Sequence, residues 1–228
     1  MTPPPIRDAA TLIIVARDDG RPKLLMGRRH AGHKFMPGKF VFPGGAVDAE
    51  DAQMAVAGPL DEAVAAKLLT RTRRISQDYA RALALAAFRE TFEETGLALG
   101  VTDCGAPPDP PAGAWARFAE TGVFPTLEGL EFLARAITPP GRPRRFDARF
   151  FVVDARWIAH RAEGVVHPEA ELTELVWVGL DEALALEIPN ITRQVLGDLA
   201  ALGPPPWDRA RPRPFYRMVR GQHAVESI

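Results

Sequence analysis

The sequence predicts a mixed α/β fold. Short apolar or alternating runs typical of strands are interleaved with longer stretches in which apolar residues recur at helical spacing. Of the 228 residues, 46% are hydrophobic and 25% are charged, which is ordinary for a globular chain with a substantial core. No internal repeat is visible. We therefore expect one domain over residues 1–228, built from strands and helices in mixed order.

The first half is predicted to contain three strands and two helices, at residues 11–17, 23–28 and 40–42 and at residues 60–74 and 78–95. Asp18-Asp19-Gly20 is a turn sequence between two alternating runs, which indicates a strand pair. Gly58-Pro59 marks the beginning of the first helix. Asp78 is the predicted cap of the second.

The second half is predicted to alternate between helices and strands. After a loop at residues 105–112 we expect a helix at 115–121, strands at 130–138, 149–154 and 172–178, and helices at 180–186 and 191–202. Residues 139–143, with three prolines and a glycine, separate the first two of these strands. Gly203 ends the last helix. Residues 204–228 are read as a proline-rich tail.

Composition excludes several classes of protein. The net charge of −1 gives no general attraction to nucleic acid, and no apolar run approaches the roughly 18 residues that cross a bilayer. Cys104, the single cysteine, excludes an intramolecular disulfide, and the N-terminus lacks the pattern of a signal peptide. We expect a cytoplasmic protein with no nucleic-acid or membrane partner. The sequence does not predict an oligomeric state.

The most informative segment is Arg89-Glu90-Thr91-Phe92-Glu93-Glu94-Thr95-Gly96-Leu97. On a helix its three glutamates fall within an arc of about 100°, opposite an apolar face. Like charges at this spacing repel unless a cation occupies the site. Oxygen ligands without a thiol favour Mg²⁺ or Mn²⁺ over zinc. Gly96 suits the left-handed position that ends a helix.

A glycine pair lies upstream of this helix, in Phe42-Pro43-Gly44-Gly45-Ala46. Without a Cβ, the backbone at Gly44 and Gly45 can approach a metal or a phosphate closely. Both glycines are therefore predicted to contact the cofactor or the substrate.

Together the two segments resemble the signature of the Nudix hydrolases. Gly45 aligns with the first glycine of that signature, Asp51 stands where the family has a glutamate, and the segment 89–97 matches the second half. One departure is large: residues 52–88 separate Asp51 from Arg89, where the family usually has seven residues. The resemblance implies the Nudix fold, a mixed β-sheet sandwiched between α-helices, with a helical insertion inside the motif. We expect apolar residues of this insertion at 60, 64, 68 and 75 to pack on the domain.

The resemblance also implies metal-dependent hydrolysis of a diphosphate in a small nucleoside diphosphate derivative. Glu90 and Glu94 would be direct ligands of Mg²⁺ or Mn²⁺, and Glu93 a third or water-mediated one. Arg89 would hold these carboxylates in place. Water would attack phosphorus in line.

The general base is left open by the sequence. Glu90 and Glu93 are candidates inside the motif, and Glu169, Glu171 and Glu174 are candidates in a later acidic segment. A solvated strand edge explains that acidic segment equally well.

Substrate choice rests on a narrower resemblance. Residues 28–45, the long insertion and residues 138–151 look like the Nudix branch that contains the peroxisomal coenzyme A diphosphatase. Coenzyme A or an acyl ester is therefore the leading substrate. Arg142, Arg144, Arg145 and Arg149 are candidate contacts for its phosphates, although solvated loop arginines are an equal alternative for the first three.

Two other functions compete with this one. The first is hydrolysis of ADP-ribose or a dinucleotide polyphosphate. The second is an inactive Nudix-fold binding or regulatory module, against which the intact Arg89, Glu90, Glu93 and Glu94 argue.

Overall fold

A computed structural model describes residues 4–17, 20–33, 36–205 and 207–228. Its main sheet contains β1 (Ile6–Ala16), β2 (Lys23–Arg29), β3 (Phe40–Val41), β4 (Gly44–Ala46), β6 (Glu131–Ile137), β7 (Arg145–Asp154), β9 (Leu172–Gly179), β10 (Pro214–Val219) and β11 (Gln222–Ser227). The helices are α1 (Glu62–Leu69), α2 (Gln77–Thr95), α3 (Ala114–Glu120), α4 (Leu180–Ala185) and α5 (Asn190–Leu202). The predicted α/β class is confirmed.

The described strands follow the order β11-β10-β6-β7-β1-β2-β3, with β4 paired to β1 and β9 paired to β2. The pairs β1–β7 and β6–β10 are parallel and the others are antiparallel. The predicted pairing of the first two strands is confirmed by the register Val15–Leu24. Their predicted turn lies partly outside the described residues.

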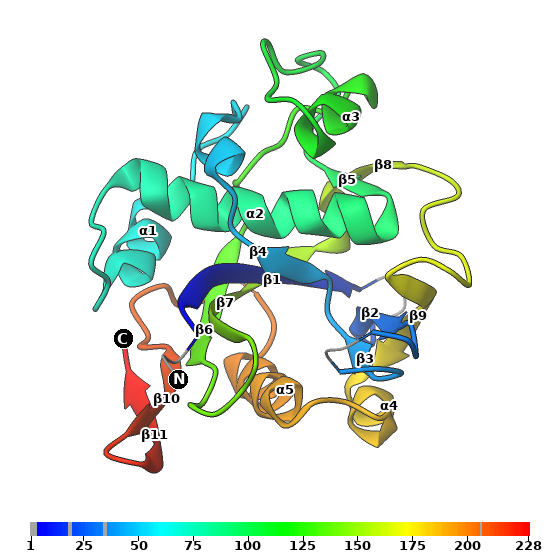
Figure 1. The fold of residues 1–228 in the computed structure, drawn as a ribbon. Helices are drawn as coiled ribbons and strands as arrows, with labels where there is room; N and C mark the ends of the chain where they lie inside the picture. The colour runs from blue at the N-terminus through cyan, green and yellow to red at the C-terminus, as the bar shows by residue number, and fades with distance from the viewer. Residues whose placement is uncertain (1–3, 18–19, 34–35, 206) are drawn as a thin grey trace.

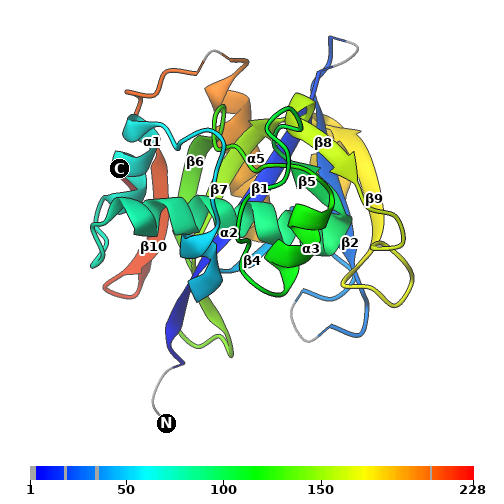
Figure 2. The same ribbon diagram turned by 90° about the horizontal axis from the view of Figure 1, so that it is seen from above.

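Helices cover both faces of the sheet. α2 lies across one face, and α4 and α5 lie on the other (Figure 1). Seen from above, α2 crosses the strands β10, β6, β7 and β1 (Figure 2). Side chains alternate along a strand, so successive residues of β1 enter different cores. Leu12 and Ile14 pack under α2, whereas Ile13 and Val15 pack toward α4 and α5.

The long helix α2 has a cap at each end. Ser76, and not Asp78, caps its N-terminus, because the Ser76 hydroxyl accepts a hydrogen bond from the Tyr79 N–H at 3.2 Å. Asp78 lies in the first turn instead, where the positive end of the helix dipole stabilises its negative charge. Gly96 ends α2 at φ 76°, as predicted.

The insertion at residues 52–88 packs on the domain, but its helix is shorter than predicted. Val64 and Leu68 of α1 are buried in the core under α2, and Leu60 packs against that core. The chain leaves the helix at Thr70, and Arg71 adopts φ 55°. Ile75 therefore leaves the stripe and is 80% exposed, which corrects the expectation that it packs with the others.

The C-terminal segment is not a simple tail. β10 and β11 form a hairpin that joins the sheet beside β6 through Phe215 and Tyr216. The Arg213 and Ile228 backbones exchange two hydrogen bonds, which close the hairpin. Pro212 and Pro214 therefore lead into the last strand pair of the sheet.

A separate two-stranded sheet, β5 (Leu97–Leu99) with β8 (Ile158–Arg161), was not predicted. Both strands are too short for a periodic signal. No helix within the described residues is long and apolar enough to cross a bilayer.

Candidate active site

Arg89 connects α2 to the segment around the glycine pair. Its Nε and Nη2 donate to Asp51 at 2.8 and 3.1 Å, and Nη2 also donates to the Ala46 carbonyl at 2.7 Å. Its Nη1 donates to Glu90 at 2.9 Å and to Glu93 at 2.8 Å. Burial alone would lower the pKa of Arg89, but the hydrogen bond and charge of Asp51 and the charge of Glu90 raise it. This cation therefore fixes the helix against the loop.

Asp51 is a positioning residue with no exposed surface. Besides Arg89 it accepts hydrogen bonds from the Trp115 indole at 2.9 Å and from the Asp48 backbone N–H at 2.9 Å. Its oxygens are thus committed to protein donors. The sequence placed Asp51 in the motif but contained no signal that Trp115, from α3, would contact it.

The two glycines of β4 face opposite sides. The Gly44 N–H donates to Glu94 Oε2 at 3.0 Å, and a Cβ on Gly44 would collide with the Ala10 carbonyl and Thr11 Cα. A Cβ on Gly45 would collide with the carboxyl group of Glu90. Because side chains are absent at both positions, β4 can lie directly against the glutamates of α2.

Glu94 is buried, with 6% of its surface exposed. Burial raises the pKa of Glu94 well above its usual value, and the charges of Glu171 and Glu90 raise it further. The Gly44 N–H and the Arg29 charge act in the opposite direction. A buried carboxylate under this repulsion is stabilised by a nearby cation.

Glu90 lies one turn before Glu94 and faces the same space. Burial raises the pKa of Glu90 to about 7, although Arg89 opposes the shift. Glu93 is placed differently: its carboxylate pairs with Arg89 at 2.8 Å and with Arg117 at 3.4 Å. The structure therefore groups Glu90 with Glu94 and directs Glu93 toward two arginines.

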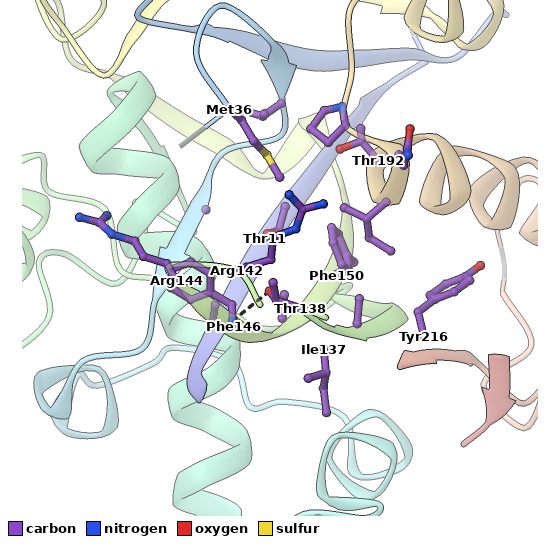
Figure 3. Close-up of a pocket in the computed structure, with 18 of the residues that line it drawn as sticks. Thr11, Met36, Ile137, Thr138, Arg142, Arg144, Phe146, Phe150, Thr192 and Tyr216 are labelled. Atoms are coloured by element: carbon purple, nitrogen blue, oxygen red, sulfur yellow. Dashed lines mark hydrogen bonds between the residues drawn. The ribbon is translucent and has the colours of Figure 1, made fainter. Parts of the chain in front are cut away.

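A cavity of about 1470 Å³ begins at these residues. Gly44, Gly45, Glu90 and Glu94 all line it, which unites the two segments singled out in the sequence. It continues over the sheet toward β10, with Thr11, Phe150 and Tyr216 on its surface (Figure 3). Its size suits a substrate larger than a typical drug-sized ligand.

The donor set fits a hard divalent cation at Glu90 and Glu94. Both offer carboxylate oxygens from successive turns of one helix, and burial disfavours the charge of both unless a cation offsets it. The expected cluster of three carboxylates is not formed. Within the described residues no three acidic, histidine or cysteine side chains are grouped closely enough to hold a metal, and Glu93 pairs with Arg89 and Arg117.

The acidic segment that runs into the beginning of β9 provides two different environments. Glu171 lines the cavity and pairs with Arg29 at 2.8 Å. Glu174 is half-exposed and pairs with Arg28 at 3.1 Å, on the strand register opposite that arginine. Its placement does not support the expected catalytic role of Glu174, because its carboxylate faces Arg28 and not the cavity.

The four candidate arginines also separate. Arg142 and Arg144 line the cavity, whereas Arg145 donates to the Thr138 carbonyl at 3.1 Å. Arg149 is only 1% exposed, so the expectation that it contacts the substrate is wrong. Its position on β7 points it under α2, where it pairs with Asp8 at 2.7 Å and donates to the Tyr79 hydroxyl at 3.2 Å.

Comparison with known proteins gives two informative relatives. A crystal structure of a NUDIX hydrolase from Alicyclobacillus acidocaldarius is 30% identical, with a TM-score of 0.63, over 86% of this chain and 92% of that one. The Caenorhabditis elegans protein named "Putative nudix hydrolase 7" is 28% identical over 192 residues, 78% of this chain. The chain spans 55% of the length of that curated relative. No protein-family model matches the chain.

Proposed function

This chain belongs to the Nudix hydrolase family, and we propose that it hydrolyses the diphosphate of coenzyme A or of an acyl ester of coenzyme A. The observation that carries the proposal is the lining of the cavity. At one end it holds the paired Glu90 and Glu94, and elsewhere it holds cationic side chains and a long apolar surface. A diphosphate with an extra phosphate and a long uncharged arm matches these three parts.

Glu90 and Glu94 are the proposed ligands of Mg²⁺ or Mn²⁺. When bound, the cation supplies charge neutralisation and Lewis acidity at the diphosphate. Arg89 keeps Glu90 in place, and the Gly44 N–H fixes Glu94. Glu93 acts here as a positioning residue that orients Arg89 and Arg117.

Glu171 is the proposed proton acceptor for the attacking water. It lines the cavity that Glu90 and Glu94 also line, and its charge reaches Glu94 strongly enough to raise the pKa of that group. Its ion pair with Arg29 restricts its position. Glu174 has the same chemistry but a carboxylate directed at Arg28.

Arg142 and Arg144 are the proposed contacts for the 3′-phosphate of coenzyme A. Both line the cavity from the loop between β6 and β7 (Figure 3). A guanidinium can bind a phosphate through two parallel hydrogen bonds. Arg145 and Arg149 have backbone and carboxylate partners and are left out of this contact.

The test is a substrate panel of coenzyme A, dephospho-coenzyme A, ADP-ribose and diadenosine polyphosphates with Mg²⁺ or Mn²⁺, with products separated by chromatography. We expect 3′,5′-ADP and 4′-phosphopantetheine from coenzyme A. Coenzyme A should exceed dephospho-coenzyme A in kcat/KM by roughly tenfold, the value of one charge-assisted phosphate contact.

The R142Q/R144Q double variant should remove this preference, whereas Arg73→Gln, at an exposed arginine of the insertion, should retain it. Equal wild-type rates on coenzyme A and dephospho-coenzyme A, or a preference for ADP-ribose, would contradict the coenzyme A proposal. Absence of turnover on the whole panel would favour the inactive binding module.

A further inference from the structure

A row of small side chains crosses the sheet inside the cavity. Cross-strand pairing places Ala46 beside Ala9, Ala9 beside Ala148, and Ala148 beside Ala136. We call these four residues the alanine row. They belong to four different strands, and all of them line the cavity. A floor of methyl groups leaves the space above it open.

The row continues onto the C-terminal hairpin. Ala136 pairs with Tyr216 of β10, and Tyr216 pairs with Val225 of β11. Both line the same cavity. With strands about 4.8 Å apart, five such steps give a groove about 24 Å long, perpendicular to the strands.

The walls of this groove are largely apolar. Phe146 and Phe150 stand two residues on either side of Ala148 and therefore share its face of β7. Ile188, just before α5, and Ile191, in its first turn, line the cavity as well. In Figure 3, Phe150 lies between Thr11 and Tyr216. An uncharged, extended ligand suits this lining better than a phosphate.

The two ends of the groove differ. Ala46 directly follows Gly45, against which Glu90 lies, so this end opens at the proposed metal site. At the other end the Tyr216 hydroxyl is held by Asp198 at 2.8 and 2.9 Å. Val225, at the same end, is 64% exposed, so its side chain is accessible to a ligand that reaches the hairpin.

A buried polar group faces the same space. Thr192 of α5 lines the cavity and is 5% exposed. Within the described residues its hydroxyl has no hydrogen-bond partner in the protein. Because Thr192 lines the cavity, its hydroxyl is available to a polar group of a bound ligand.

We propose that the groove over the alanine row binds the long uncharged arm of the substrate, and that the β10–β11 hairpin contacts the thiol or acyl end of that arm. The inference rests on the proposed coenzyme A function. The amides of the arm provide partners for Thr192. An acyl chain that passes Tyr216 covers Val225.

Binding can be tested without catalysis. Pantetheine, which carries the arm but no diphosphate, is titrated to millimolar concentration into protein labelled on its alanine methyl groups. We expect shifts at Ala9, Ala46, Ala136 and Ala148 in methyl NMR spectra, with Ala66 on the exposed face of α1 unaffected. No shift, or shifts confined to other alanines, overturns the groove assignment.

A steric test uses the full-length enzyme. Ala136→Leu fills the groove and should lower the ratio of kcat/KM for coenzyme A to that for ADP-ribose by roughly tenfold or more. Ala66→Leu is the matched control and should leave the ratio unchanged. An equal loss on both substrates contradicts the proposal, because it indicates a general distortion.

Since Ala136 is 8% exposed, a second variant at an exposed position avoids a folding defect. Val225→Asp should lower the rate on long-chain acyl esters relative to free coenzyme A. An unchanged ratio shows that the hairpin does not contact the end of the arm. If the wild-type enzyme does not hydrolyse coenzyme A, the proposed substrate is refuted. The pantetheine titration then still tests whether the groove binds the uncharged arm.

Discussion

The three glutamates of the motif lie close together on one helix, but each has different neighbours in the structure. Glu94 is buried beside the Gly44 N–H, Glu90 shares Arg89 with Asp51, and Glu93 lies between two arginines. Each difference follows from the 100° step between helix positions, which turns the carboxylates toward different neighbours. The consequence is that equal substitutions should have unequal effects.

Glu94→Gln should abolish most turnover while the protein still folds. The change keeps the shape and the hydrogen bond from Gly44 but removes the charge that a cation needs. We expect kcat to fall by about 10²-fold or more, equivalent to about 2.7 kcal/mol. Stability in urea should be equal or higher, because a like-charge repulsion is relieved. Turnover near the wild-type value at saturating Mg²⁺ would remove Glu94 from the site.

Asp51→Asn should act on stability. It leaves the buried guanidinium of Arg89 with a weakened partner, and we expect the free energy of unfolding to fall by about 3 kcal/mol. Asp78→Asn is the matched control, because Asp78 forms an exposed ion pair with Arg81 and should change stability by less than about 1 kcal/mol. Urea unfolding of both variants compares them. Similar decreases in the free energy of unfolding for both variants would show that the Asp51–Arg89 contact stabilises the fold no more than an exposed ion pair does.

At the scale of elements, the site depends on a three-residue strand. β4 pairs with β1 through Ala9, Ala10 and Thr11 and thereby holds its glycines against α2. Its two glycines are required for different reasons. Gly44 is limited by backbone atoms, which cannot move, and Gly45 by the end of a flexible side chain.

Gly44→Ala and Gly45→Ala should therefore give different defects, the first in stability and the second in metal affinity. Gly44→Ala should destabilise the fold by about 1–3 kcal/mol, since its Cβ meets the Ala10 carbonyl. Gly45→Ala should leave the fold largely intact but displace Glu90, so that the Mg²⁺ concentration for half-maximal activity rises roughly tenfold. Thermal unfolding and metal titration separate the two. If Gly44→Ala has normal stability but needs more Mg²⁺ for half-maximal activity, the role given to Gly44 here is wrong.

The insertion is a second element whose role can be measured. Leu68 of α1 is 1% exposed, whereas Ile75 is 80% exposed. We expect Leu68→Ala to cost about 2–5 kcal/mol in chemical unfolding. Ile75→Ala should stay within about 0.5 kcal/mol of the wild type. Equal effects would mean that α1 does not pack as described.

For the whole molecule, the proposed binding of a cation by the buried carboxylates of the cavity would couple metal concentration to the stability of the fold. A cation that binds only the folded state stabilises it by about 2.7 kcal/mol at one hundred times its Kd. We therefore expect Mg²⁺ or Mn²⁺ to raise Tm relative to NaCl of equal ionic strength. In the Glu94→Gln variant the increase should be largely lost. An equal increase in both proteins would indicate binding elsewhere.

The sequence by itself determined the class of fold, most of the elements and the family. Helical spacing, capping residues and glycines are local properties, so the pattern of residues 77–97 was sufficient to predict the end of α2 and the acidic face. The motif of Gly45, Arg89, Glu90 and Glu94 is equally local once its two halves are aligned. The long insertion did not obscure it, because each half is recognisable by itself, and in the structure Arg89 contacts Asp51 across the insertion.

Only the tertiary structure decided which of these residues meet. Arg149 and Glu174 looked like Arg142 and Glu171 in the sequence, but strand register directs Arg149 under α2 and Glu174 toward Arg28. The β10–β11 hairpin and the alanine row arise from pairing between segments far apart in the chain. A β-strand has the same local pattern whatever strand lies beside it, so its neighbours are set by the packing of the whole chain.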